Sequence, residues 1–284
     1  MKYPRILAAI RAAKWAVTPI TLQAIRDTLS ARLTGHLPAM AGEMDNYSEP
    51  DGDEIETTPV FTFIAPGVAS VRLHGIIGKN LSSLEMVCGG CDIARVEANL
   101  TAALADSAVS SVLLDIDSPG GSVGGVAEFS KKISELSSGF GKPVLAYASG
   151  QCCSAAYWIA CGCSGIIASP SSDVGSIGVY IALVDESENW AEEGYRLVLI
   201  KAGEFKGAAI SGSAITPEQI ALFQADVDFI YVQFTSAVRT ARPGIANSTM
   251  QGQTFYGPRA FDVSLVDAIA PDAASAASQL TANV

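Results

Sequence analysis

A serine at the start of a predicted helix is the first residue of this chain that could carry out chemistry. Ser154 follows the apolar, strand-like run 143–148 and opens the helix-forming run 154–160, SAAYWIA. No charged residue occurs between Lys142 and Asp173, so this turn lies in an apolar setting. Such a serine is either a helix cap or a nucleophile, because both functions place the hydroxyl group at the N-terminus of a helix.

A second serine, Ser122, matches the G-x-S-x-G pattern of the nucleophile in α/β-hydrolases. That fold needs a histidine later in the chain than the serine. The only histidines are His36 and His74, and both precede Ser122. The pattern therefore does not predict a hydrolase triad, and we expect both histidines to be structural.

A lysine is the known alternative base for a serine nucleophile. Its pKa in water is about 10.4, so burial must lower the pKa before the amine can accept a proton. Lys206 follows an apolar run among small and apolar residues, and Lys201, at the end of the same run, competes with it. By spacing alone, either lysine is more often a solvated surface residue.

The loop 117–121, DSPGG, ends one apolar strand-like run and precedes a helical run. Two consecutive glycines in such a loop allow backbone N–H groups to face a ligand, with a helix N-terminus behind them. This arrangement suits an oxyanion hole. An ordinary glycine-rich turn between a strand and a helix would have the same sequence.

Four motifs in a fixed order resemble the signal peptide peptidase family of serine–lysine proteases. They are DSPGG at 117–121, SAAYWIA at 154–160, VGSIGV at 174–179 and GEFK at 203–206. Two later runs, GQTFYG at 252–257 and LVDAI at 265–269, resemble the closing segment of that family. Together these motifs extend the resemblance over most of the chain after residue 60.

The resemblance implies a role for each matched residue. Ser154 is the implied nucleophile, Lys206 is the implied general base, and Ser176 is the residue that would orient the lysine. The backbone N–H of Gly121, with that of Ala155, is the implied oxyanion hole. The reaction implied needs no metal or nucleotide cofactor.

The spacing agrees with that of the family and favours Lys206 over Lys201. Ser176 lies 22 residues (176 − 154) and Lys206 lies 52 residues (206 − 154) after Ser154. One departure concerns the residues after the nucleophile, where the family often has two glycines and this chain has two alanines. Both are small, so we expect activity to be retained.

From residue 60 onward, strand-like and helix-like runs alternate, which is typical of an α/β fold with a buried, mostly parallel sheet. The resemblance implies the Clp-protease/crotonase fold class, in which repeated ββα units build a mostly parallel core sheet. We also expect strands at 177–184 and 197–200, and a long helix that is capped by Thr216 and has Pro217 at its first position.

Composition divides the chain into four regions. We expect an N-terminal helical arm at 1–37, an acidic linker at 38–59, the Ser-Lys protease domain at 60–270 and a surface tail at 271–284. The linker has seven acidic residues and no Lys or Arg.

Charge and hydropathy restrict the partners. The net charge of −11 and the lack of a basic stripe argue against nucleic acid. Arg11 and Lys14 interrupt the apolar N-terminal run, which argues against a signal peptide. Pro and Gly divide the uncharged run 143–172, which argues against a membrane-spanning helix. We expect a soluble cytoplasmic protein without a membrane anchor.

The start of the chain, with the run WAVTP from Trp15, resembles the phage head-maturation branch of the family. That branch cleaves scaffold and capsid proteins inside the prohead. The resemblance therefore implies a protein or peptide substrate, a location in the host cytoplasm or the prohead, and a homo-oligomer. Three alternatives stay open: a cytoplasmic peptidase that degrades signal peptides, a crotonase-like acyl-CoA enzyme, and a non-enzymatic shell or scaffold protein.

Cys88 and Cys91 have the C-x-x-C spacing of a metal or redox site. A structural zinc ion would need two more ligands. We therefore expect small buried thiols here rather than a metal site.

Overall fold

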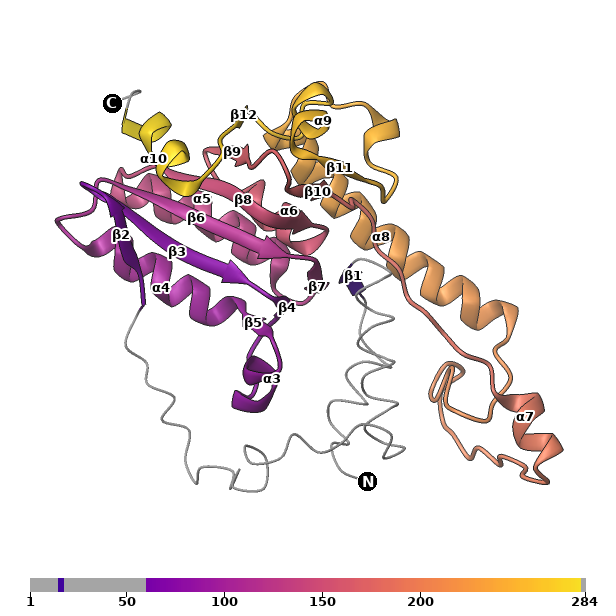
Figure 1. Ribbon diagram of the computed structural model, residues 1–284. Helices are drawn as coiled ribbons and strands as arrows, with labels where there is room; N and C mark the ends of the chain where they lie inside the picture. Colours follow the sequence, from indigo (N-terminus) through magenta and orange to yellow (C-terminus); the bar gives the residue numbers. More distant parts are fainter. Residues whose placement is uncertain (1–14, 18–59, 282–284) are drawn as a thin grey trace.

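The main sheet is built from long apolar strands that lie side by side in parallel. A computed structural model describes residues 15–17 and 60–281. In it β3 (Val68–His74), β6 (Ser111–Ser118) and β8 (Val144–Cys153) form the centre of the sheet, with β6 in the middle (Figure 1). The inward-facing side chains of these strands are fully buried, which explains why each strand appears in the sequence as an almost continuous apolar run.

Shorter strands complete this sheet. Two of them, β9 (Gly165–Ala168) and β10 (Asp173–Gly175), also pair in parallel with β8. The antiparallel partners lie at the edges and are β2 (Thr62–Ala65) beside β3 and β11 (Thr254–Tyr256) beside β10. The last strand, β12 (Ala268–Ile269), pairs in parallel with β9.

A second, smaller sheet stands at the carboxyl ends of the central strands. Its strand order is β1 (Trp15–Val17), β7 (Gly120–Ser122), β4 (Ile76–Gly78) and β5 (Gly90–Asp92). The long strands β3 and β6 are each followed by a short strand of the second sheet and then by a helix, as in β6–β7–α5, whereas β8 leads directly into α6 (Ala155–Ala160). This repeated ββα unit confirms the predicted fold class.

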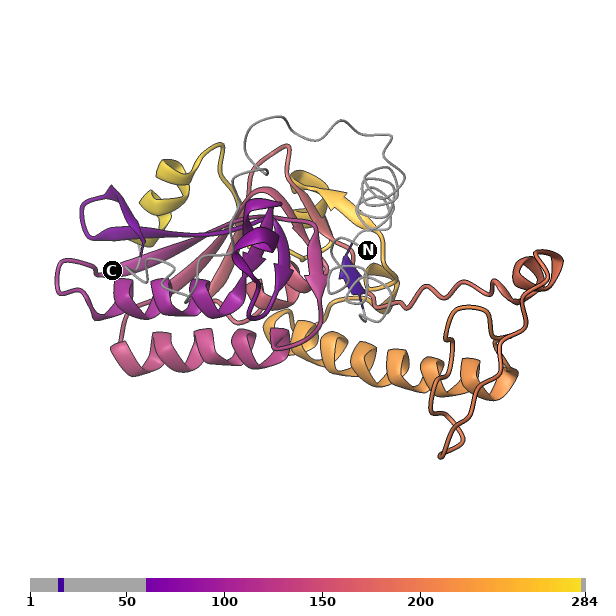
Figure 2. The same ribbon diagram turned by 90° about the horizontal axis from the view of Figure 1, so that it is seen from below.

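Helices cover both faces of the main sheet (Figure 2). One face packs against α4 (Ile93–Ala105) and α5 (Val126–Phe140). The other face carries α10 (Ala273–Thr281), which packs against β2, β6 and β8. The tail is therefore not a simple surface segment, since Ala276 and Ala277 are fully buried. The predicted N-terminal helical region 1–37 and the acidic linker 38–59 lie outside the described residues, apart from β1.

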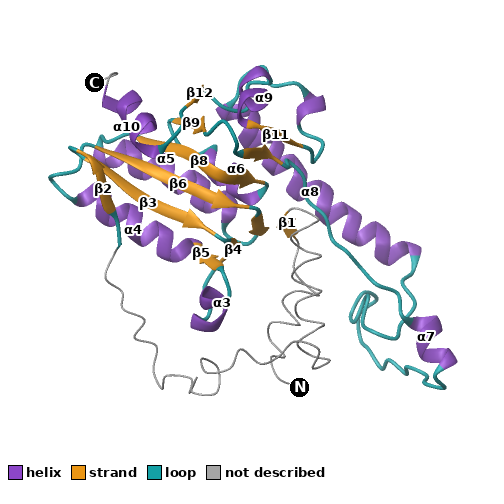
Figure 3. Cartoon of the chain, in the orientation of Figure 1, coloured by secondary structure: helices purple, strands orange, loops and turns teal. Residues whose placement is uncertain are grey.

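A segment that follows β10 and ends within the long helix α8 projects away from the sheet. We define residues 179–233 as the arm; it contains α7 (Ser187–Glu192) and the first two thirds of α8 (Pro217–Ala241) (Figures 1 and 3). The strands predicted at 177–184 and 197–200 were wrong, because these residues run as extended chain or loop with only an isolated bridge at Tyr180. Ile200 is 94% exposed, so this part of the chain offers no neighbouring strand to bury it.

The long helix begins as predicted. Pro217 is its first residue, and the Thr216 side chain accepts a hydrogen bond from the Gln219 N–H. Its second half is buried through Phe234 and Val238, and Phe234 stacks on Trp158 with ring centroids 4.7 Å apart. Two short helices complete the part of the chain that the structure describes, α3 (Ser83–Val87) and α9 (Gly257–Asp262). No helix among these residues is long and apolar enough to span a bilayer.

Candidate active site

Ser154 occupies the turn between β8 and α6 (Ala155–Ala160), where the sequence analysis placed it. Its backbone has φ 55° and ψ −118°, a region that non-glycine residues rarely adopt. The side chain makes no capping hydrogen bond to the helix, and the Ser154 Oγ lies 3.5 Å from the carbonyl oxygen of Gly178, at the limit for a hydrogen bond. The hydroxyl group is thus held in a strained turn without the bonding of a cap, which favours the nucleophile over the cap.

Ser176 lies beside Ser154. The two strands that precede these serines are parallel neighbours, with Gly175 of β10 opposite Cys153 of β8. The N–H of Ser154 donates to the Gly175 carbonyl at 2.7 Å, and the N–H of Ser176 donates to the Gln253 carbonyl at 2.8 Å. Both serines are buried. The register therefore brings the implied nucleophile and the implied orienting residue to the same edge of the sheet.

Backbone strain singles out the same two residues. Five non-glycine residues of the described chain have a positive φ, and two of them are Ser154 and Ser176. Such a conformation costs of order 1–3 kcal/mol and is found preferentially at functional sites. The strain is an independent observation in favour of a site here, since the sequence motifs alone do not reveal it.

Gly121 lies on β7, which packs against α6. A Cβ atom at Gly121 would be 2.0 Å from the backbone oxygen of Ile77, so only glycine allows β7 and β4 to approach this closely. The turn before it is fixed by Ser118, whose hydroxyl donates to the Gly75 carbonyl at 2.6 Å and accepts from the Gly120 N–H at 3.2 Å. The loop 117–121 is therefore a rigid support for β7 beside the helix that starts after Ser154.

Comparison with known sequences decides the family. The profile described as "Peptidase family S49" matches residues 138–283, more than half of the chain. The chain belongs to peptidase family S49. The matched residues include both serines and the whole arm, and this membership confirms the predicted family.

Phage proteins are among the relatives in this family. The chain is 30% identical over 252 residues to the head-tail preconnector protein GP5 of Enterobacteria phage P21, covering 87% of this chain and 49% of that protein. It is 23% identical over 271 residues to the capsid assembly protease C of Escherichia phage lambda, covering 93% of this chain and 58% of that protein. The chain thus spans about half the length of these relatives.

Among solved structures, the chain is similar to a substrate-peptide complex of the membrane-bound stomatin-specific protease 1510-N. The TM-score is 0.45 and the sequence identity is 17%, and the match covers 76% of this chain and 80% of that one.

Lys206 is not brought to Ser154 within one copy of the chain. It lies in the loop between α7 and α8, together with its competitor Lys201, and both side chains are exposed. This loop lies at the end of α8 that is remote from the sheet (Figures 1 and 2). Of the predicted S49 site residues, the structure therefore assembles Ser154, Ala155, Ser176 and Gly121, and leaves the lysine on the arm.

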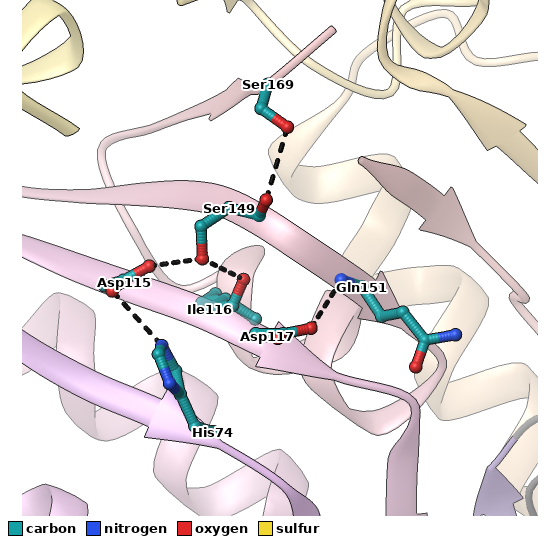
Figure 4. Close-up of polar contacts among 7 residues, drawn as sticks. All are labelled: His74, Asp115, Ile116, Asp117, Ser149, Gln151 and Ser169. Carbon is teal, nitrogen blue, oxygen red and sulfur yellow. Dashed lines mark hydrogen bonds and ion pairs between the residues drawn. The ribbon is translucent and has the colours of Figure 1, made fainter. Parts of the chain in front are cut away.

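A separate polar cluster lies on the face of the main sheet away from α4 and α5 (Figure 4). The Asp115 carboxylate accepts a hydrogen bond from the Ser149 hydroxyl at 2.5 Å and pairs with the His74 Nε2 at 3.1 Å. Burial favours a higher pKa for Asp115, but the hydrogen bonds from His74 and Ser149 outweigh it and hold the pKa below its usual range. The carboxylate stands between the serine and the histidine, so this is not a serine–histidine–aspartate triad.

The cysteines supply no metal site in the part of the chain that the structure describes. Both are free thiols, and the prediction that they are buried is confirmed for Cys91 and wrong for Cys88, which is exposed. Burial raises the pKa of Cys91 to about 12, so it stays protonated at neutral pH. No group of three or more His, Cys, Asp or Glu side chains in the described residues could hold a metal ion. The spacing of this pair therefore reflects a turn and a packed strand.

Proposed function

We propose that this chain is a serine endopeptidase that uses Ser154 as nucleophile and Lys206 as general base. The observation that supports it best is the strained, uncapped Ser154, beside Ser176 and against the strand that holds Gly121. Membership of a peptidase family gives the reaction class.

The reaction proposed is acyl transfer to water through an acyl-enzyme. Neutral Lys206 takes the proton from the Ser154 Oγ as the oxygen attacks the peptide carbonyl carbon. The backbone N–H groups of Gly121 and Ala155 stabilise the negative oxygen. The lysine then protonates the leaving amine, and water, deprotonated by the same lysine, releases the acyl group and restores the Ser154 hydroxyl.

The base has to come from another copy of the chain for this reaction to run. Apolar side chains on the arm are strongly exposed in a single copy, among them Val198, Ile200, Phe229 and Val232, at 72%, 94%, 67% and 63%. Exposed apolar surface of this extent is typical of a protein interface. We infer a homo-oligomer in which the arm of one copy packs against the core of the next and delivers Lys206 to the Ser154 of that copy.

An interface also supplies the desolvation that the base needs. A lysine acts as a base only when burial lowers its pKa toward neutrality. The loop around Lys206 is exposed in a single copy, whereas an apolar interface around Ser154 and Ser176 would bury the amine.

Proteins of phage head assembly are the proposed substrates, inside the host cytoplasm or the prohead. The two phage relatives match 87% and 93% of this chain, whereas a putative signal peptide peptidase of Enterococcus faecium matches 58%. The longer matches favour head assembly over the degradation of signal peptides.

Active-site labelling tests the proposed nucleophile. A fluorophosphonate probe should form an adduct on Ser154 in the assembled wild-type protein, located by peptide mass spectrometry, and Ser154→Ala should abolish it. Ser134→Ala is the matched control, because Ser134 is exposed on α5 and lies outside the site, and it should label as the wild type does. A crotonase-like enzyme or an inert shell protein would give no adduct on Ser154.

A further inference from the structure

One edge of β7 is occupied by a piece of the chain that is remote in sequence. β1 pairs with β7 in antiparallel orientation, with Trp15 opposite Ser122, Ala16 opposite Gly121 and Val17 opposite Gly120. The other edge of β7 is filled by β4, through Ile77 opposite Gly121. Without β1, which lies beside β7 in Figure 1, this edge of β7 would have no paired strand among the described residues.

This edge has the properties of a peptide-binding site. An exposed strand edge binds an extended peptide by adding it as a further strand, with main-chain hydrogen bonds giving the affinity. β7 packs against α6, the helix that begins directly after Ser154, and it carries the proposed oxyanion donor Gly121. A peptide on this edge therefore runs past the nucleophile with its carbonyl groups next to the donor.

We propose that this edge of β7 binds the backbone of the substrate and that residues 15–17 hold it as an internal competitor. The inference rests on the proposed function, since it takes Ser154 and Gly121 as the reacting site. The segment pairs with β7 as an added antiparallel strand does, and Ala16 lies opposite Gly121, the proposed oxyanion donor. A substrate must displace this segment before it reaches Ser154.

A tethered competitor weakens binding of a free peptide by a predictable factor. Its effective concentration is on the order of millimolar. If the segment alone binds with a Kd of about 0.1 mM, a free peptide with the same contacts binds about tenfold more weakly than it would to the empty edge.

Proline substitutions test the competitor through its backbone. Neighbouring residues of an antiparallel strand alternate between directing the N–H toward the partner strand and away from it. One of Ala16→Pro and Val17→Pro therefore removes an N–H that faces β7. Ala16→Ser and Val17→Thr keep the N–H and are the matched controls.

The probe is a fluorescein-labelled peptide of residues 11–21, RAAKWAVTPIT, and its binding is measured by anisotropy to full-length protein that carries Ser154→Ala. One proline variant should bind it about tenfold more tightly than the parent, and the two controls should bind as the parent does. Equal affinity in the parent and both proline variants, or no measurable binding to any of them, would overturn the inference.

Hydrogen exchange supplies a second measurement, which compares the parent protein with the two proline variants. The amide protons of residues 120–122 should exchange faster in the activating proline variant and should be protected again by unlabelled peptide. Exchange that is the same in the parent and in both proline variants contradicts the proposal even where one variant is poorly folded.

Failure of the inference and failure of the proposed function have different signatures. Fluorophosphonate labelling of Ser154 in the wild type without any gain in peptide binding overturns the inference alone. A gain in binding without labelling overturns the proposed peptidase reaction and leaves β7 as a peptide-binding edge.

Discussion

The backbone N–H of Ser154 donates a 2.7 Å hydrogen bond to the carbonyl of Gly175, the residue before Ser176. The bond joins the turn after β8 to the end of β10. Both serines have a positive φ. The hydrogen bond therefore ties the strained turn at Ser154 to the strand that leads into the strained turn at Ser176. A change at Ser176 should therefore reach the nucleophile through the backbone as well as through the proposed base.

The first prediction concerns the orienting residue. Ser176→Ala should lower kcat by between about tenfold and hundredfold, because a general base that is poorly placed loses much of its contribution. KM should change little, since the hydroxyl group is not proposed to hold the substrate. Steady-state kinetics on a peptide substrate give both values. Ser134→Ala, at an exposed serine of α5, is the control and should keep the kcat of the wild type. An unchanged kcat in Ser176→Ala as well would remove Ser176 from the site.

The second prediction concerns the close approach of two strands. Gly121→Ala would place a Cβ atom 2.0 Å from the backbone oxygen of Ile77, which cannot move aside as a side chain can. We expect the free energy of unfolding to fall by about 1–3 kcal/mol and the Tm to fall by several degrees. The kcat of the folded variant should also fall, because the oxyanion donor moves as well.

Gly124→Ala is the matched control for this change. A Cβ atom at Gly124 would meet no neighbouring atom within 4 Å, and this glycine lies in the same loop region. The Tm and kcat of this variant should stay close to those of the wild type. A Gly121→Ala protein as stable and active as Gly124→Ala would mean that β7 and β4 do not approach as described.

The third prediction concerns pH and the Asp115 carboxylate. Its pKa is lowered in the folded protein, so its stabilising contribution is present above its ordinary pKa of about 3.9 and is lost as the pH falls through the folded value. Asp115→Asn should therefore lower the free energy of unfolding at pH 7 by about 1–3 kcal/mol, the usual effect for a hydrogen-bonded charge.

Urea unfolding at several pH values measures this difference. The gap between the wild type and Asp115→Asn should begin to narrow below about pH 4, where the carboxyl group is protonated in the unfolded state, and should close only below the lower pKa of the folded state. Asp262→Asn is the control, because Asp262 forms only an exposed pair with Arg259 at 3.5 Å, and such pairs contribute little. A gap that persists unchanged at low pH would show that packing, not charge, is responsible.

Local patterns in the sequence were enough to predict much of this fold and site. The strands β6 and β8 are continuous apolar runs, and the loops that follow them hold Gly121 and Ser154 where the predicted strands end. The alternating runs predicted a buried, mostly parallel sheet, and the resemblance to the protease family implied the ββα units. Such local signals fix which residues leave the sheet at the same edge, and parallel pairing then brings them together.

The remaining features depend on contacts that a local pattern does not encode. The run 197–200 is apolar, but Val198, Leu199 and Ile200 are exposed, so hydrophobicity did not distinguish a buried strand from an exposed apolar loop. The pairing of β1 with β7 joins residues more than a hundred positions apart, and three residues carry too little periodicity to predict a strand. The position of Lys206, in the exposed loop between α7 and α8, likewise depends on contacts that no local pattern encodes.

The last prediction tests whether one copy supplies the lysine to another. Ser154→Ala and Lys206→Ala should each be inactive alone. When the two variants are co-expressed and assemble at random, each site draws its serine and its lysine from different copies, so about a quarter of the sites should be intact. Peptide hydrolysis should therefore recover to about a quarter of the wild-type rate at equal protein concentration.

Ile200→Asp, added to both variants, should abolish this recovery, because it places a charge on the most exposed apolar residue of the arm. Val60→Asp is the matched control, since Val60 is 58% exposed but lies outside the arm, and recovery should persist with it. Sedimentation velocity on the same samples should show smaller assemblies for Ile200→Asp only. No recovery in a mixture that does co-assemble would mean that Lys206 reaches Ser154 within its own copy, and the interface proposed for the arm would then have to be abandoned.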